Sequence, residues 1–398
     1  MNILQLCKKN PFPANDGESI AILQISKGMV AQGHQVTILA MNTPKHHSEI
    51  DELPPGLKAQ IDFHFIKVNT SIKIGNALIN LCRRNSYHIE RFKSIDYQRK
   101  LIQLLRETKF DIIQAEGIYL ALYLQTIRKY SNAKTILRSH NVEHLIWQRI
   151  ARHTKNPFKK IYLHNQAKRL KTFELNALNQ FDGIASISPI DTKIFQSNGC
   201  RIPIADILPG LHIADYPLSI NERPIENCCI FGALDWIPNQ EGLSWFINQV
   251  WPMVHKQDSN LKLLIAGRNS ADWIKKLDGN GIEFLGELPD AASFYASHNL
   301  FLIPLLSGSG IKIKIIEALA YGKTIVATPV AVEGTGLIPG IHLLQADDAK
   351  TFAAAILTCV RDTDVRVRLA KTGSRYVRKK YALEKIILQL FEFYESLN

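Results

Sequence analysis

Short apolar segments alternate with helical segments twice along this chain, and this alternation restricts the fold more than any other feature. The first series starts with an expected strand at residues 3–6, a helix at 19–32 and a second strand at 36–40. A strand, a helix and a strand in this order form a βαβ unit, which predicts a parallel sheet with right-handed crossovers. Further strands of this series are expected at residues 61–68, 111–115, 135–139, 183–186 and 204–208.

A second alternation follows a proline-punctuated linker that starts at Pro209. Its expected strands lie at residues 228–232, 261–267, 282–285, 300–304 and 324–327, and its expected helices at 241–250, 311–320, 350–361, 365–381 and 383–397. The fold class is therefore α/β, with two doubly wound, Rossmann-like domains. We expect an N-terminal domain at 1–208, a C-terminal domain at 209–375, and a final helical segment at 376–398 that packs toward the N-terminal domain. Because ligands bind at the carboxyl ends of such strands, an interdomain cleft is expected.

Charge is distributed unevenly between the two halves. Residues 1–210 contain 29 Lys and Arg against 16 Asp and Glu, whereas residues 211–398 contain 19 against 20. Two basic segments, 83–109 and 149–171, hold much of the excess, and the second also carries Phe158 and Ile161. A basic amphipathic pattern is typical of contact with anionic lipid, although a solvated basic helix explains it equally well. No zinc-finger, KH or RRM signature is present, so nucleic acid is not an expected partner.

Other sequence features limit where the protein works. No apolar run approaches the roughly 18 residues that span a bilayer, and the N-terminal residues are too polar for a signal peptide. The six cysteines show no metal-ligand spacing, which suits reduced thiols. We therefore expect a cytoplasmic protein, with peripheral attachment to the inner membrane face through the two basic segments as an option.

A Gly/Ser loop joins the expected strand at 300–304 to the expected helix at 311–320. A strand, a glycine loop and a helix N-terminus together provide free backbone N–H groups for an anion. At 100° per residue, Gly310, Lys314 and Glu317 fall within about 60° of one another, while Lys312 lies roughly opposite. Lys314 provides a cation for a phosphate, and Glu317 provides a carboxylate for paired sugar or ribose hydroxyls. Together they predict a nucleotide-diphosphate site. An ordinary surface pair of Lys and Glu is the alternative.

Several segments resemble a known enzyme family. Residues 308–328 (Gly-Ser-Gly-Ile-Lys-Ile-Lys-Ile-Ile-Glu-Ala-Leu-Ala-Tyr-Gly-Lys-Thr-Ile-Val-Ala-Thr) and 332–337 (Val-Glu-Gly-Thr-Gly-Leu) are similar to the donor-binding signature of the glycosyl transferases group 1. Residues 231–239, 33–36 and 138–143 resemble other segments of that family, so the resemblance covers most of both domains. It implies a retaining GT-B glycosyltransferase that moves a sugar from a nucleotide-diphosphate sugar to a glycan or lipid-linked acceptor, in cell-surface polysaccharide or lipopolysaccharide synthesis.

The resemblance also implies roles for residues of the Gly/Ser loop and the helix after it. Glu317 would bind the two ribose hydroxyls of the donor nucleotide. Lys314 would stabilise the charge of the leaving diphosphate, and the backbone of Ser309, Gly310 and Ile311 would hold its phosphates.

Residues outside that loop receive roles by the same resemblance. His140 would bind the transferred sugar near the reacting carbon, in a positioning role rather than as a general base. Gly17 would lie in a loop that approaches the acceptor or a phosphate, and Leu288 would contact the base through backbone groups. Gly232 and Arg268 complete the expected donor-binding set.

Three departures from the family pattern bear on these roles. Ser309 stands where the family usually has the first of two glutamates, which leaves the identity of the donor sugar open. The loop 232–239 lacks a basic residue, and the N-terminal loop has Asp16-Gly17 in place of two glycines. No metal is expected to be required, and Asp362-Thr363-Asp364, although it matches a DxD pattern, lies in a polar turn away from any strand end.

Alternatives of other classes remain open at this point. A nucleotide-sugar 2-epimerase shares the expected two-domain architecture, and a non-catalytic nucleotide-sugar-binding module would need the same donor loop. An NAD dehydrogenase is not expected, because no GxGxxG follows the first strand. Glu116 and Glu143 are either acids at helix starts or contacts to the acceptor, and His144 is expected at the surface.

Overall fold

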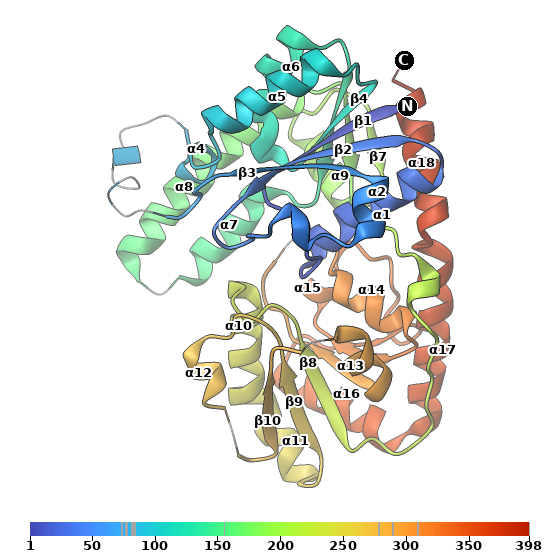
Figure 1. Ribbon diagram of the computed structural model, residues 1–398. Helices are drawn as coiled ribbons and strands as arrows, with labels where there is room; N and C mark the ends of the chain where they lie inside the picture. Colours follow the sequence, from blue (N-terminus) through green and yellow to red (C-terminus); the bar gives the residue numbers. More distant parts are fainter. Residues whose placement is uncertain are drawn as a thin grey trace. The chain divides into compact units, whose positions relative to one another are not determined.

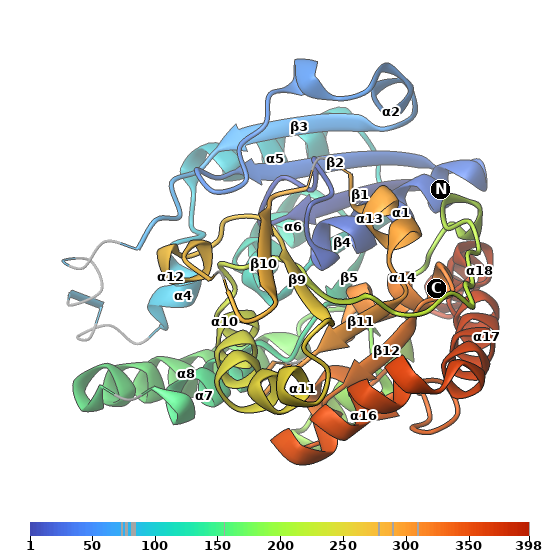
Figure 2. The ribbon, with the colours of Figure 1, turned by 90° about the horizontal axis from the view of Figure 1, so that it is seen from below.

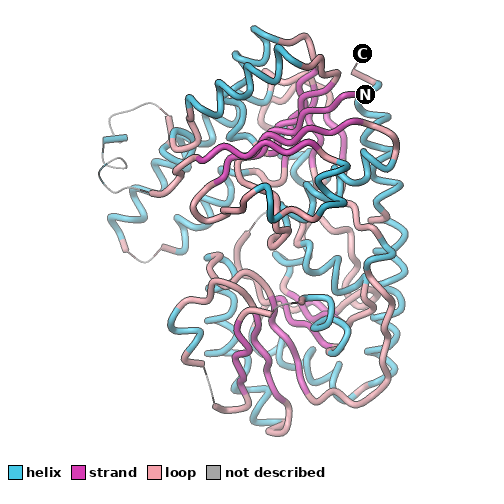
Figure 3. The backbone as a smooth tube through the Cα atoms, viewed as in Figure 1, coloured by secondary structure: helices cyan, strands magenta, loops and turns pink. Residues whose placement is uncertain are grey.

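The computed structural model describes residues 1–72, 75, 79–80, 85–154, 156–277, 279–288, 290–308 and 310–397. They form two compact units: unit 1 comprises Met1–Gly210 and Leu383–Asn398, and unit 2 comprises Leu211–Ala382. In each unit the strands lie at the centre and helices surround them (Figure 3). The division lies at 210/211 rather than 208/209, and the C-terminal segment of unit 1 begins at 383 rather than 376, because the preceding helix continues to Lys380.

Unit 1 is built on a seven-stranded parallel sheet with the order β3-β2-β1-β4-β5-β6-β7 (Figure 1). The strands are β1 (Asn2–Cys7), β2 (Gln35–Asn42), β3 (Asp62–Lys67), β4 (Ile112–Glu116), β5 (Lys134–Ser139), β6 (Gly183–Ser186) and β7 (Ile204–Asp206). In the register of the central strands, Leu6 pairs with Leu39 of β2 and with Ala115 of β4. The strand order reverses at β1, so a switch point lies between β1 and β4.

The helices of unit 1 connect these strands and end in a C-terminal helix that returns to the unit. They are α1 (Gly17–Ala31), η1 (Ile50–Glu52), α2 (Pro55–Gln60), α4 (Tyr87–Glu90), α5 (Ile95–Glu107), η2 (Ile118–Tyr123), α6 (Leu124–Tyr130), α7 (Glu143–His153), α8 (Pro157–Leu178), α9 (Pro189–Ser197) and α18 (Leu383–Glu395). The carboxylate of Asp16 caps α1 by accepting the Ser19 N–H at 3.0 Å.

The two faces of the unit 1 sheet are covered differently. Because side chains alternate between the two faces along β1, Leu4 and Leu6 lie in an apolar core shared with α5, α6 and α8. Gln5 points to the opposite face, where its amide accepts from Ser26 of α1 at 2.5 Å. Helix α18 packs against α1 so closely that a Cβ added at Gly28 would lie 2.5 Å from the Ile387 side chain. The final helix thus covers a sheet face that carries buried polar groups.

Unit 2 contains a six-stranded parallel sheet with the order β10-β9-β8-β11-β12-β13. The strands are β8 (Asn227–Phe231), β9 (Lys262–Ala266), β10 (Ile282–Gly286), β11 (Leu300–Ile303), β12 (Thr324–Ala327) and β13 (Leu344–Gln345). The two-residue strand β13 was not expected from the sequence, because its apolar run is too short to predict. The order reverses at β8, which places the second switch point between β8 and β11.

The helices of unit 2 include the expected ones near 241–250, 311–320, 350–361 and 365–381, and several short helices that the sequence did not predict. They are η3 (Ile213–Asp215), α10 (Ile237–Trp245), the π-helical turn η4 (Phe246–Val250), α11 (Trp251–Gln257), α12 (Asp272–Lys275), α13 (Ala291–Ser297), α14 (Ile313–Ala320), α15 (Pro329–Val332), α16 (Ala349–Arg361) and α17 (Thr363–Lys380). Helix α16 lies beside β12 and α11 (Figure 2). None of the described helices is long and apolar enough to cross a bilayer.

Alternate side chains of β11 reach the two faces of this sheet. Leu300 and Leu302 join a core formed with α10, α11 and α16. Phe301 contacts the opposite layer, where its ring centroid lies 4.9 Å from that of Tyr295 in α13. Because both sheet faces are covered, a ligand reaches this sheet at the carboxyl edge, and the switch point is where a crevice is expected.

Candidate functional site

The loop after β11 is longer than expected, because the helix that follows it starts two residues later than predicted. Helix α14 begins at Ile313 with Lys312 as its N-cap, so Gly310 belongs to the loop and not to the helix face predicted for it. Gly310 has a φ of 69°, a left-handed conformation that favours glycine. Lys312 was expected to point away, but its ammonium donates to the Gly310 carbonyl at 2.5 Å. Ile311 is buried beside them, and Ser309 lies outside the described residues.

Lys314 connects this helix to the loop after the neighbouring strand β8. Its ammonium donates to Asn239 Oδ1 at 3.0 Å, and the Asn239 amide donates to the Ala233 carbonyl at 2.7 Å. Gly232 directly follows β8, and a Cβ added there would lie 3.4 Å from Lys314 Nζ. The structure therefore brings Gly232, Asn239 and Lys314 together at the switch point between β8 and β11.

The charge of Lys314 is poorly compensated in this setting. Burial, and then the nearby Lys312 ammonium, lower the pKa of Lys314 from 10.5 to about 7. Lys314 forms no ion pair with any described residue, and the polar partner it has, Asn239, is neutral. An anion bound beside Lys314 would restore its positive charge, which is the property expected of a phosphate-binding lysine.

Glu317 lies one turn further along α14 and is surrounded by tyrosines. The Tyr216 hydroxyl donates to Glu317 Oε1 at 3.2 Å. Burial raises the pKa of Glu317 from 4.5 to about 7, and the Tyr216 hydrogen bond opposes this shift. The rings of Tyr216 and Tyr295 each lie 5.1 Å from Tyr321. This carboxyl group has one protein donor among the described residues and retains acceptor capacity for ligand hydroxyls.

The other expected donor residues lie at the same edge of the unit 2 sheet. Arg268 follows β9, and its carbonyl accepts the Leu234 N–H at 3.0 Å, which ties it to the loop after β8. Leu288 follows β10. Contacts of these two residues to a nucleotide stay predictions.

In unit 1, His140 lies at the end of β5 beside the end of β4. Its Nε2 lies 2.7 Å from Glu116 Oε2, and both side chains are buried. A carboxylate partner holds the proton on Nε2 and leaves Nδ1 for a substrate group. His140 does not cap the next helix, because the N-cap of α7 is Val142.

Glu116 is the centre of a buried hydrogen-bond network. Its Oε1 accepts from Gln5 at 2.9 Å and from Gln114 at 2.5 Å. The Gln114 carbonyl in turn accepts from the Tyr394 hydroxyl of α18. Both oxygens of Glu116 are thus occupied within the protein, so it supports His140 and is neither of the two alternatives considered from the sequence.

A second polar cluster lies at the carboxyl end of β1, around the ammonium of Lys8. This ammonium lies 3.2 Å from Glu18, 3.4 Å from Glu143 and 4.8 Å from the centre of the Tyr119 ring. Burial alone would lower the pKa of Lys8, but the two carboxylates hold it above its usual value. Glu18 Oε1 is buried and has no hydrogen-bond partner among the described residues, so it can accept from a substrate hydroxyl. Gly17 precedes Glu18 at the start of α1.

His144 contradicts the expectation of a surface histidine. It is buried, and its Nδ1 lies 2.6 Å from Glu174 of α8. Glu174 also accepts the backbone N–H groups of Glu143 and His144 at 3.0 and 3.1 Å, which secures the start of α7. This histidine is therefore a structural group that the sequence, with its basic surroundings, did not distinguish.

The described residues contain no group of three or more His, Cys, Asp or Glu side chains that could hold a metal ion. Within the DxD pattern, Asp362 caps α17 by accepting the Val365 N–H at 2.9 Å. This contact gives the pattern a structural role.

Several residues of these clusters were not identified from the sequence. Lys8 and Glu18 flank the loop after the first expected strand, and the rule that ligands bind at carboxyl ends of strands was the signal that could have found them. Asn239 and Tyr216 carried no such signal, because they reach Lys314 and Glu317 from 75 and 101 residues away.

Replacing Glu317 by Gln should stabilise the ligand-free protein at alkaline pH. The pKa of Glu317 is near 7 in the folded state and 4.5 in the unfolded state. The free energy of unfolding therefore decreases as the pH rises from about 4.5 to about 7, because ionisation of this carboxyl group favours the unfolded chain. We expect Glu317→Gln to raise the free energy of unfolding by roughly 1–3 kcal/mol at pH 8 and to change it little at pH 4, since one pKa unit corresponds to about 1.4 kcal/mol. Urea unfolding at both pH values tests this, with the exposed Glu283→Gln as a control that should have no effect.

Replacing Tyr394 by Phe should destabilise unit 1. The change removes the hydroxyl donor and leaves the buried Gln114 carbonyl unsatisfied, at a cost of roughly 1–3 kcal/mol. Thermal unfolding should show a lower midpoint than the wild type, whereas Tyr162→Phe, which alters a partly exposed hydroxyl, should leave it unchanged. Equal midpoints for Tyr394→Phe and wild type would contradict the network.

Comparison with known proteins connects these clusters to a family. The family profile described as Glycosyltransferase Family 4 matches residues 16–212, and the profile described as Glycosyl transferases group 1 matches residues 226–362. An uncharacterized 44.6 kDa protein in the cps region of Klebsiella pneumoniae is 26% identical over 96% of this chain and 97% of its own length.

Similarity also extends to part of a named mannosyltransferase and to the fold of a solved structure. A phosphatidyl-myo-inositol mannosyltransferase of Mycobacterium tuberculosis is 30% identical over 37% of this chain and 41% of its own length. The crystal structure of Anabaena Alr3699/HepE in complex with UDP and glucose superimposes with a TM-score of 0.70 at 16% identity, and covers 99% of both chains. The two family matches and this shared fold show that the chain belongs to the glycosyl transferases group 1, with the GT-B fold.

Proposed function

We propose that this glycosyltransferase uses a nucleotide-diphosphate sugar and transfers its sugar, with retention of anomeric configuration, to a glycan or lipid-linked acceptor of a cell-surface polysaccharide or lipopolysaccharide. The observation that carries this proposal is the pair of buried, uncompensated groups Lys314 and Glu317 at the switch point of unit 2. A nucleotide diphosphate supplies what both lack, an anion for the ammonium and ribose hydroxyls for the carboxyl group.

Breaking the sugar–phosphate bond moves an electron pair onto the departing diphosphate. The Lys314 ammonium and the free N–H groups at the start of α14 are fixed before the reaction, so they stabilise that charge without reorganisation. The protein supplies the positive charge itself, and we propose that the reaction needs no metal. In this mechanism the departing diphosphate, rather than a protein group, accepts the proton of the acceptor hydroxyl.

Unit 1 contributes the groups that position the sugar and the acceptor. His140, held by Glu116, presents Nδ1 to a hydroxyl of the transferred sugar. The unpartnered Glu18 Oε1 beside the Gly17 turn accepts from an acceptor hydroxyl. Lys8 lies 3.2 Å from Glu18 and, against the effect of burial, holds the pKa of that carboxyl group below its usual value.

The nucleotide that binds unit 2 is the first point to test. UDP is bound by a protein of the same fold, and relatives of this chain are named as mannosyltransferases, so both uridine and guanosine nucleotides belong in the panel. We expect one of UDP, GDP, ADP or CMP to raise the thermal midpoint of the wild type. Lys314→Met should lower the affinity for that nucleotide about 10–100-fold, since a charge-assisted hydrogen bond contributes roughly 1.5–3 kcal/mol.

The control for this experiment is Lys262→Met, which removes an exposed lysine of β9 in the same unit. It should bind the nucleotide as the wild type does. A nucleotide that binds Lys314→Met and Glu317→Ala as tightly as wild type would show that the site lies elsewhere. Binding without any sugar transfer would favour a non-catalytic module.

We also propose that the protein is cytoplasmic and attaches peripherally to an anionic membrane surface through the amino end of α8. Phe158 and Ile161 are 82% and 70% exposed there, with Lys159 and Lys160 exposed between them. Apolar side chains flanked by lysines suit the boundary between headgroups and acyl chains. This surface belongs to the basic segment 149–171, in which Lys155 lies outside the described residues, as do Arg83 and Arg84 of segment 83–109.

Vesicle sedimentation at low salt tests this attachment. The wild type should bind anionic vesicles more strongly than neutral ones, and Phe158→Ala/Ile161→Ala should bind at least about tenfold more weakly, given roughly 1.5–3 kcal/mol for each buried apolar side chain. Ile50→Ala/Leu388→Ala removes two exposed apolar side chains of unit 1 outside both basic segments and should bind like wild type. No preference for anionic lipid would contradict the proposal.

A further inference from the structure

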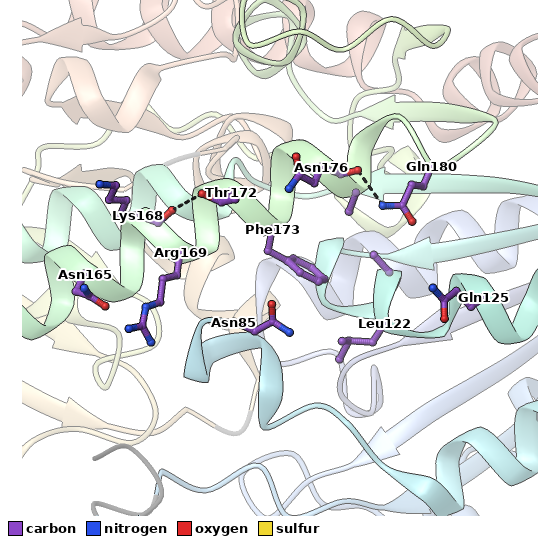
Figure 4. Close-up of a pocket in the computed structure, with 12 residues that line it drawn as sticks. Asn85, Leu122, Gln125, Asn165, Lys168, Arg169, Thr172, Phe173, Asn176 and Gln180 are labelled. Carbon is purple, nitrogen blue, oxygen red and sulfur yellow. Dashed lines mark hydrogen bonds between the residues drawn. The ribbon is translucent and has the colours of Figure 1, made fainter. Parts of the chain in front are cut away.

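A polar hollow of about 600 Å³ lies along α8, away from the clusters described above (Figure 4). Its floor contains the partly buried Phe173 and Leu122, and Figure 4 shows Arg169 and Phe173 projecting from α8 toward Asn85 and Leu122. Besides Arg169, the polar groups of the lining are five amides, one hydroxyl and a second cation: Asn85, Gln125, Asn165, Asn176, Gln180, Thr172 and Lys168.

This combination matches the chemistry of a sugar chain. Side-chain amides both donate and accept hydrogen bonds, as neighbouring sugar hydroxyls do. An aromatic ring beside them offers an apolar face for the C–H face of a sugar ring. The volume falls in the range of sites that hold small ligands, roughly 300–1,000 Å³.

A second hollow of about 900 Å³ lies at the amino-terminal ends of β4 and β5, and it is strongly basic. Five cations line it: Arg106, Lys109, Arg128, Lys129 and Lys134. None of the five forms an ion pair with a described residue. The one acid of the lining, Asp111, accepts the Asn2 N–H at 2.7 Å. Arg106 and Lys129 lie 5.1 and 5.5 Å from the centre of the Tyr130 ring.

Lining residues of the two hollows are hydrogen-bonded to each other. Arg128, which lines the basic hollow, donates to the backbone carbonyl of Gln180, which lines the amide-rich hollow. Gln125 and Arg128, on successive turns of α6, likewise line one hollow each. An extended ligand can therefore contact both without leaving unit 1.

We propose that these two hollows form a binding site for an acidic oligosaccharide, with the sugar rings on the amide-rich hollow and carboxylate or phosphate substituents on the basic one. The proposal deepens and rests on the proposed function, since it assigns the acceptor glycan a negative charge and a contact with unit 1 beyond the hydroxyl that Glu18 accepts. The amide-rich hollow has one aromatic ring in its lining, Phe173, and the basic hollow has two, of which Phe110 is buried and Tyr130 is partly exposed. Single-stranded nucleic acid requires a series of exposed stacking platforms. The hollows are concave and polar, which separates them from the exposed apolar tip of α8.

Binding of hexagalacturonate at low salt, measured by calorimetry without nucleotide, tests this site. We expect the wild type to bind hexagalacturonate more tightly than the neutral maltohexaose. Phe173→Ala should lower the affinity for hexagalacturonate about tenfold, because the ring contact is lost. Arg106→Gln/Lys129→Gln should lower it by about the same factor, because two charges are lost. Lys27→Gln/Lys193→Gln, which removes two exposed lysines of the same unit, should bind like wild type.

Three results would overturn the proposal. They are absence of hexagalacturonate binding at millimolar concentration, an equal loss in the lysine control, and tighter binding of a twelve-residue oligothymidylate that the same variants abolish. The last result would assign the site to nucleic acid. Phe173→Ala should keep the thermal shift produced by the donor nucleotide, so failure of this site and failure of the donor site are separate outcomes.

Discussion

Compensation of buried charge at the carboxyl edges of the two sheets is the constraint on which this structure depends. In unit 1 the ionisable groups contact one another, because Lys8 lies between Glu18 and Glu143 and His140 contacts Glu116. In unit 2 the described partners are neutral: Lys314 contacts Asn239 and Glu317 contacts Tyr216. Lys314 is thus left without a charged partner among the described residues, and the proposed nucleotide site rests on this difference between the two units.

The sequence predicted the parts of this arrangement that depend on local pattern. The alternation of apolar and helical segments gave both parallel sheets, because a crossover helix between parallel strands has a recognisable period and length. The Gly/Ser loop directly follows an expected strand, and this position predicted that Lys314 and Glu317 lie at the carboxyl edge of the second sheet. His140 required the family resemblance, since a histidine after a strand has no distinctive local pattern.

Contacts between distant segments could not be predicted. The Tyr394 hydroxyl reaches Gln114 across 280 residues, and nothing in the sequence near either residue indicates the pairing. The start of α14 was also misplaced by two residues, because Lys312 has extended backbone as the N-cap residue and its ammonium turns back to donate to the Gly310 carbonyl. That shift brings a second cation close to Lys314, which is one physical cause of its lowered pKa. Helix periodicity alone places Lys312 on the opposite face.

The central claim is that unit 2 holds a sugar diphosphate whose bond to the sugar breaks with the help of Lys314. Proton NMR of UDP-glucose, GDP-mannose and ADP-glucose, each incubated with the protein without acceptor, measures this directly. The account predicts that one α-linked donor releases free sugar, with the α anomer appearing first, and that Lys314→Met slows the release at least about tenfold. Release from none of the donors, or release at the same rate in wild type and Lys314→Met, would contradict it.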